Sequence, residues 1–213
     1  MLDWEIYNKK QTKFSKKIEI NNQKNFFNYI HKDKYNHVRD HLPLVLSMIQ
    51  KKKLKILDFG GTLVSYFDSR KKNYSNLQYF IYNPHFNEKK FLNNKSNEFL
   101  YINKIENLRC DLLYLNSVVQ YINDLDKFFF KEISKNLRFN YLLLTDVMVT
   151  KNKSFRFKQH NHNIFCKAHN MINLEKSLKK IKMIKIYQSA FKKMRIKQKE
   201  IYLVNYIFKN KNI

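Results

Sequence analysis

With 213 residues, 44% of them hydrophobic, the chain has the length of one large domain and enough apolar side chains for a core, which argues against wholesale disorder. Only two cysteines are present, Cys110 and Cys166, which excludes a disulfide-rich secreted scaffold and a four-cysteine zinc site. The formal net charge is +25, a value typical of proteins that bind nucleic acid or an anionic membrane surface.

The composition offers a second explanation of this charge. Lysine supplies 36 of the 42 basic residues, asparagine occurs 27 times, and glycine and proline occur only twice each, as expected from A/T-rich codons. Nucleic-acid-binding proteins favour arginine for contacts to bases and phosphates, and arginine is scarce here. We therefore interpret the lysine excess as codon bias, and nucleic acid as a possible but less favoured partner.

The N-terminal segment is expected to lie outside the main domain. Residues 1–20 are polar and basic, and residues 24–51 carry apolar side chains at helical spacing, which predicts two amphipathic helices. Pro43 is expected in the first turn of the second helix. We expect an N-terminal arm and helical extension over residues 1–52 and an α/β domain over residues 53–213.

The period then changes to short apolar runs, which predict strands at 54–59, 77–82, 98–102, 111–115 and 140–145, with a helix at 125–137. Strands that alternate with helices indicate a parallel sheet. Residues 146–173 are polar, rich in His and Asn and without a clear period, so a long binding loop is expected there. A helix at 174–181 and an antiparallel pair at 183–187 and 201–208, joined by the basic segment 192–199, complete the chain.

Two features bear on location. The sequence starts Met1-Leu2-Asp3-Trp4-Glu5, without the basic-then-apolar order of a signal peptide. The most apolar window, residues 141–149, is too short to span a bilayer. No transmembrane segment and a cytoplasmic location are expected.

Both glycines of the chain, Gly60 and Gly61, follow the first predicted sheet strand directly, and Asp58 precedes them. In a chain so poor in glycine, this pair points to a turn where a ligand approaches the main chain. A dinucleotide fingerprint is excluded because Thr62 and Ser65 occupy its later glycine positions, and no phosphate-binding Gly-Lys-Ser/Thr occurs. Asp58 is expected either to order the turn or to meet the ligand.

The segment Leu57-Asp58-Phe59-Gly60-Gly61-Thr62-Leu63-Val64 resembles the first motif of class I S-adenosylmethionine-dependent methyltransferases. Residues 110–122 and 141–146 resemble the fourth and fifth strands of these enzymes. Within the class, the chain resembles a methyltransferase family found among bacterial surface-polysaccharide genes, through the following segments in order: Leu57–Gly61, Val119–Tyr121, Leu143–Thr145, Gln159 and Asn170.

The resemblance implies a Rossmann-like class I methyltransferase fold, with a mostly parallel seven-stranded sheet and a C-terminal antiparallel hairpin. It implies S-adenosylmethionine as cofactor, and methylation of a small molecule or a sugar, with a role in surface-glycan biosynthesis. The cofactor-binding residues that follow are Asp58, Gly60, Gly61, Asn83, Asn116 and Ser117, and the substrate-binding residues are Gln120, Gln159, His160 and Asn161. The catalytic candidates are His160, His162 and Asp146, and His169 in the same polar stretch is a further candidate for a general base. No metal site is expected.

Two other interpretations remain open at this point. An RNA methyltransferase would need its lysines gathered beside the cofactor site, with aromatic side chains on which bases stack. A degenerate methyltransferase fold that acts as a partner protein is indicated by Thr62, Val64 and Asn83, which depart from the pattern of the class.

Overall fold

A computed structural model describes residues 41–49, 51–61, 76–83, 99–159, 164–196 and 198–212. The strands are β1 (Leu54–Phe59), β2 (Leu77–Tyr82), β3 (Phe99–Tyr101), β4 (Leu108–Asn116), β5 (Leu137–Thr150), β6 (Phe155–Gln159), β7 (Ile164–Asn170), β8 (Met183–Ile196) and β9 (Lys199–Asn210). The helices are α3 (Leu42–Met48), η3 (Val119–Tyr121), the π-helix η4 (Lys127–Ile133), α5 (Ser134–Asn136) and α6 (Met171–Lys180). None of these helices is long and apolar enough to cross a membrane.

The sheet is mixed but mostly parallel. Strands β3, β2, β1, β4 and β5 lie side by side in that order, and each neighbouring pair is parallel. Strand β9 lies between β5 and β8 and runs antiparallel to both. The predicted fold class, with its C-terminal antiparallel hairpin, is confirmed, although the described residues contribute nine strands to the sheet in place of the expected seven.

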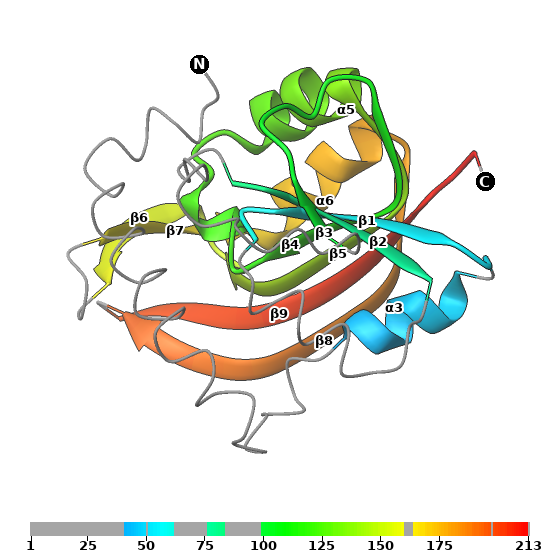
Figure 1. Cartoon of the computed structure of the whole chain (residues 1–213). Coiled ribbons are helices and arrows are strands. Elements are labelled where there is room, and N and C mark those ends of the chain that lie inside the picture. The colour runs from blue at the N-terminus through cyan, green and yellow to red at the C-terminus, as the bar shows by residue number, and fades with distance from the viewer. Residues whose placement is uncertain are drawn as a thin grey trace, which may run out of the picture.

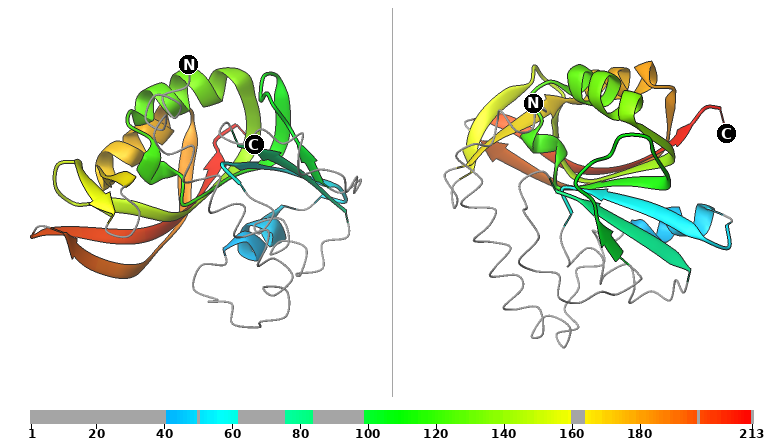
Figure 2. Two further views of the ribbon diagram at one scale, coloured as in Figure 1. Left: turned by 60° about the vertical axis from the view of Figure 1, so that its left-hand side comes forward. Right: turned by 45° about the horizontal axis from the view of Figure 1, so that its top comes forward.

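Helices cover the sheet on both faces (Figures 1 and 2). On one face, η4 and α6 bury Phe128, Phe129 and Leu174 against the central strands. On the other face, α3 buries Val45 and Leu46 against residues of β1, β2 and β4. The strands between these two layers are apolar on both sides, as buried parallel strands generally are.

The two additional strands correct the expectation for residues 146–173, which is wrong as a long loop. Strand β5 continues to Thr150, and β6 and β7 form an antiparallel hairpin. Within this hairpin, Phe157, Cys166 and Ala168 are buried together with Ile201 of β9, whereas Arg156 and Lys158 are exposed. The alternation is that of a half-buried strand pair, but the polar residues around it concealed the period.

The predicted strands at 111–115, 140–145, 183–187 and 201–208 lie within β4, β5, β8 and β9, which extend beyond them, and the predicted helices at 125–137 and 174–181 overlap η4, α5 and α6. The bounds of β1 and β2 are those predicted, and Pro43 lies in the first turn of α3. The basic segment 192–199 is not a connection, because its residues belong to the long strands β8 and β9. The expected arm at residues 1–20 and the first helix of the extension lie outside the described residues, so the division at residue 52 stays a prediction.

Candidate functional site

The glycine turn lies at the carboxyl end of β1. Gly60 has a φ of +75°, and its N–H donates a hydrogen bond of 2.7 Å to the carbonyl of Tyr82 at the end of β2. A Cβ added to Gly60 would lie 2.8 Å from Cγ2 of Val118, in the segment that follows β4. A left-handed φ and this close neighbour both require glycine. The turn thus lies against the end of β2 and against the segment that follows β4.

Asp58 is fully buried beneath this turn. The hydroxyl of Tyr79 donates a hydrogen bond of 2.7 Å to Asp58 Oδ2. A Cβ on Gly61 would lie 2.1–2.4 Å from three atoms of the Asp58 carboxyl group, so this carboxyl occupies the space of a side chain at position 61. The Asp58 carboxyl thus packs directly against the turn at Gly61, and its role toward a ligand stays a prediction.

Polar side chains connect the carboxyl ends of β4 and β5. Thr145 Oγ1 donates to Asn116 Oδ1 at 2.8 Å, and Ser117 Oγ donates to Asp146 Oδ2 at 3.1 Å. Ser117 and Asp146 both have a φ of +55°. Non-glycine residues adopt this conformation at a cost of order 1 kcal/mol, and such residues cluster at functional sites. The pair therefore marks this edge of the sheet as a candidate site.

A β-bulge sets the conformation of Asp146. Leu144 pairs with Tyr206 and Val147 pairs with Val204, which leaves Asn205 alone opposite Thr145 and Asp146. The buried side chain of Asn205 fills the bulge, and its Oδ1 accepts the Asp146 N–H at 2.9 Å.

The same asparagine reaches across the sheet to α3. Asn205 Nδ2 lies 3.2 Å from Nδ1 of His41, the residue that precedes the helix. Because an amide NH₂ only donates, Nδ1 of His41 is the acceptor, and its Nε2 carries a proton that faces Ser189 Oγ at 3.1 Å. Sequence reasoning missed both His41 and Asn205. The available signal was a lone polar residue, Asn205, inside the apolar run Leu203–Phe208.

The other predicted residues are distributed as follows. Asn83 follows β2, and its Nδ2 lies 3.4 Å from the carbonyl of Gly61. Gln120 is buried in η3. Gln159 ends β6 and pairs with Ile164 in a hairpin that joins β5 at Val149 and Thr150, the last residues of that strand. His160, Asn161, His162, Thr62 and Val64 lie outside the described residues, so their roles stay predictions.

His169 anchors β7 to the segment that follows β4. Its Nε2 lies 3.0 Å from the carbonyl of Val119, and the ring is buried. Burial, together with the nearby charge of Lys167, lowers the pKa of His169 from 6.5 to about 4. The ring is therefore neutral at pH 7 and donates to the carbonyl. His169 holds the hairpin in place and is not poised to exchange protons near neutrality.

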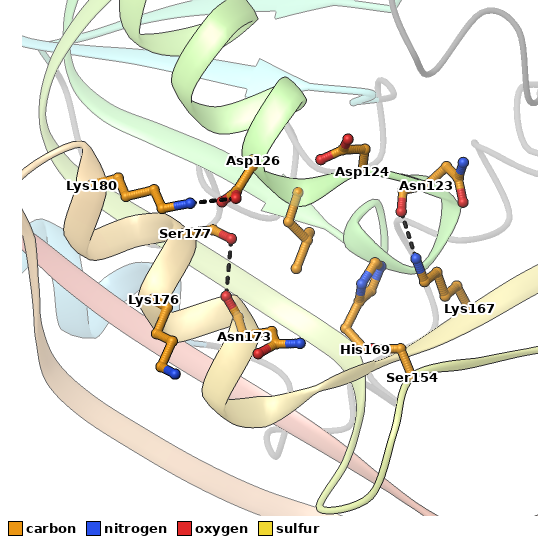
Figure 3. Close-up of a pocket in the computed structure, with 11 residues that line it drawn as sticks. Asn123, Asp124, Asp126, Ser154, Lys167, His169, Asn173, Lys176, Ser177 and Lys180 are labelled. Atoms are coloured by element: carbon orange, nitrogen blue, oxygen red, sulfur yellow. Dashed lines mark hydrogen bonds and ion pairs between the residues drawn. The ribbon is translucent and has the colours of Figure 1, made fainter.

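A polar cavity of about 560 Å³ lies between α6, the end of β7 and residues 123–126 (Figure 3). Its lining groups are bonded to one another: Lys167 Nζ donates to the carbonyl of Asn123 at 2.6 Å, and Lys180 pairs with Asp126. Val118 approaches Gly60 while the carbonyl of Val119 meets His169, so this segment separates the cavity from the glycine turn. Within the described residues, no cluster of His, Cys, Asp or Glu is arranged to hold a metal ion.

Comparisons with known proteins bear on the fold. No family model matches the sequence, and no curated protein matches it significantly. A SAM-dependent methyltransferase from Methanosarcina mazei aligns over 79% of this chain and 97% of its own, with 14% identity and a TM-score of 0.51. The 1,6-didemethyltoxoflavin-N1-methyltransferase of Burkholderia thailandensis aligns over 93% and 89%, with 8% identity and a TM-score of 0.52.

A third structure, the N-terminal domain of EvdMO1 in the presence of SAH and D-fucose, aligns over 84% of this chain and 85% of its own. The identity is 8% and the TM-score is 0.54. At identities this low the similarity concerns the fold alone. The chain thus has the Rossmann-like fold of class I methyltransferases.

Proposed function

We propose that the protein is an S-adenosylmethionine-dependent methyltransferase that acts on a small molecule or a sugar. The observation that carries the proposal is the glycine turn, where Gly60 brings the main chain of β1 against the ends of β2 and β4. In open α/β sheets, ligands bind outside the carboxyl ends of the strands. The likeness of the fold to methyltransferases supports the same edge.

The groups at this edge fit the cofactor in chemical type. S-adenosylmethionine has an amino-acid end, ribose hydroxyls and an adenine ring, and these need hydrogen-bond donors and acceptors together with exposed main chain. The turn of Gly60 and Gly61, the amides of Asn83 and Asn116 and the hydroxyl of Ser117 are groups of this kind. We assign the ribose to Asn83 and the amino-acid end to the turn and Ser117.

When bound, the cofactor supplies an activated methyl group, so the protein mainly has to align the acceptor. An oxygen or nitrogen acceptor also needs a base for its proton. Asp146 is the candidate for this role among the described residues, because Ser117 and Asn205 hold it in one orientation at the carboxyl edge. His160, His162 and Asn161, with Gln159 and Gln120, remain the proposed acceptor side.

The class of acceptor is supported by two of the structural neighbours. The Burkholderia enzyme was crystallised with 1,6-didemethyltoxoflavin and S-adenosylhomocysteine, and the EvdMO1 domain with SAH and D-fucose. In both cases the compound named beside S-adenosylhomocysteine is a small molecule. A role in surface-glycan assembly rests on the resemblance of the motifs alone, and a cytoplasmic location is part of the same proposal.

Calorimetric titration with S-adenosylmethionine and S-adenosylhomocysteine tests the cofactor. We expect both to bind the wild-type protein. Asn83→Asp introduces a carboxylate for the ribose hydroxyls, and since charge-assisted hydrogen bonds are about twice as strong as neutral ones, we expect affinity to rise about fivefold. Asn83→Ala should lower it by a similar factor. A gain of affinity cannot arise from partial unfolding, which makes Asn83→Asp the decisive variant.

Asn212→Ala, at an exposed asparagine that follows β9 at the opposite edge of the sheet, serves as the control and should leave affinity unchanged. A dissociation constant of about 1 mM corresponds to a binding free energy of about 4 kcal/mol. Absence of binding at this cofactor concentration would support the interpretation that the protein is a degenerate methyltransferase fold that acts as a partner protein. Transfer of labelled methyl groups to RNA, and not to D-fucose or other small acceptors, would contradict the proposed acceptor class.

A further inference from the structure

A second cavity, of about 520 Å³, lies at the opposite edge of the sheet. It is lined by the segment that leads into β1 and by the first residues of β1, β4 and β5. Among the described residues that line it, the cationic side chains are Lys51, Lys53, Lys55, Arg109 and Arg138, and the one acidic side chain is Asp111. Because the strands are parallel, this amino edge is separated from the glycine turn by the length of β1.

The single carboxylate is already engaged. Asp111 is buried, with Oδ1 2.5 Å from Lys51 Nζ and Oδ2 accepting the main-chain N–H of Lys55 at 2.9 Å. The side chains of Lys53, Lys55 and Arg109 are exposed and make no hydrogen bond or ion pair with any residue that the structure describes. The cavity therefore has an excess of positive charge that the described protein does not balance.

The two arginines strengthen this point. Arg109 and Arg138 are direct neighbours in the register of β4 and β5, and both are exposed. Like charges on adjacent strands repel each other. Within the part of the chain that the structure describes, the only hydrogen bond of either guanidinium runs from Arg138 Nη1 to the carbonyl of Ser134 at 2.8 Å. An anion between them would convert the repulsion into attraction.

The presence of arginine at these two positions is informative in a chain so rich in lysine. The chain has 36 lysines and only six arginines, yet two of the arginines lie side by side here. Codon bias explains scattered lysines, but it does not explain an adjacent arginine pair. The planar guanidinium binds phosphate oxygens through two parallel hydrogen bonds, which the ammonium group of lysine cannot do.

We propose that this amino-edge cavity binds a phosphate-bearing anion of about the size of a diphosphate. Its volume lies within the range of about 300–1,000 Å³ typical of small-ligand pockets. The cations converge on one cavity from β1, β4, β5 and the segment before β1, and none of the described residues that line it is aromatic. Binding of single-stranded nucleic acid uses aromatic side chains for base stacking, so a compact phosphate ligand fits better than an RNA strand.

Titration calorimetry with pyrophosphate, at about 150 mM salt so that long-range attraction is screened, tests the proposal. We expect binding that Arg109→Gln and Arg138→Gln each weaken about tenfold, the loss expected for one bidentate contact. Lys53→Gln should weaken binding about threefold, and since Lys53 is exposed without a bonding partner among the described residues, this variant folds normally. Inorganic phosphate should bind more weakly than pyrophosphate.

Arg195→Gln is the matched control, because Arg195 is an exposed arginine on β8 that pairs with Glu200, and its loss changes the net charge equally. An equal loss of affinity in this control would overturn the proposal in favour of general charge attraction. Absence of binding at about 10 mM pyrophosphate, weaker than any specific site, would also overturn it. So would an RNA 20-mer that binds through Arg138 and that pyrophosphate does not displace.

Discussion

The two edges of the sheet differ in how their polar groups are satisfied. At the carboxyl edge, Ser117, Asp146 and Asn205 are bonded to one another across β4, β5 and β9. At the amino edge, the cations of β1, β4 and β5 lie beside one another with a single, already engaged carboxylate. The hydrogen bonds at the carboxyl edge are formed by the fold before any ligand arrives. At the amino edge, an anionic ligand would relieve the repulsion between the cations. Removing a side chain should therefore be costly at the carboxyl edge and harmless, or even stabilising, at the amino edge.

The largest effect is expected from Gly60→Val. A β-branched residue is strained at a φ of +75°, and its Cβ would lie 2.8 Å from Val118. We expect at least a ~100-fold loss of cofactor affinity together with a lower melting temperature. Calorimetry and circular dichroism measure both, and Ala190→Val at an exposed strand position is the control that should change neither. Unchanged binding in Gly60→Val would refute the placement of the site.

The next largest effect is expected from pH, through His169. Its pKa is about 4 in the folded protein and 6.5 as a free group. The unfolded chain therefore takes up a proton as the pH falls through 6.5, while the folded protein does not. Stability should be complete above pH 6.5 and decrease towards pH 4, by about 2–3 kcal/mol in total.

Urea denaturation of the wild type and of His169→Gln isolates the contribution of the histidine. It is measured between pH 7.5 and pH 4.5, about three units that span this transition. The variant should be less stable at neutral pH and should lose less stability on acidification. An identical pH dependence in both proteins would show that other groups dominate.

A smaller loss is expected from Asn205→Ala, which leaves the buried N–H of Asp146 without its acceptor. The cost of an unsatisfied buried donor is about 1–3 kcal/mol, measured as the free energy of unfolding in urea. Asn205→Asp retains an acceptor for that N–H but buries a carboxylate beside Asp146 and loses the donor to His41, so it should be no more stable than Asn205→Ala. If Asn205→Ala is as stable as the wild type, the bulge does not depend on this side chain.

The smallest effect, of opposite sign, is expected at the amino edge. Arg109→Gln removes one of two neighbouring like charges, so we expect it to stabilise the protein by a few tenths of a kcal/mol at low ionic strength. The gain should vanish at about 1 M salt, where the screening length falls to about 3 Å. A destabilised Arg109→Gln at low salt would erase the contrast between the two edges.

The glycine turn could be predicted from sequence because its signal is local. A short apolar run followed by the only two glycines of the chain defines the end of β1, and the structure places the turn there. The β6–β7 hairpin was missed because its buried residues are few and its apolar partner, Ile201, lies more than 30 residues away.

The bulge and the basic cavity depend on contacts between distant parts of the chain. Asn205 contacts Asp146, which is 59 residues away in the sequence, and His41, which is 164 residues away. No local sequence pattern predicts contacts between such distant residues. Arg109 and Arg138 become neighbours only through the register of β4 and β5. The lysines of the cavity form a visible basic run at residues 51–55, but nothing in the sequence shows that this run meets the two arginines.

The position of β9 determines how the protein can fold during its synthesis. Residues 199–210 lie between β5 and β8, both of which are made earlier. Until the ribosome has extruded β9, the apolar strand β5 has an open edge, and open edges of this kind recruit other chains. The order of translation thus leaves a long interval in which the nascent chain is prone to self-association, and the lysine-rich composition, through mutual repulsion, keeps such chains apart.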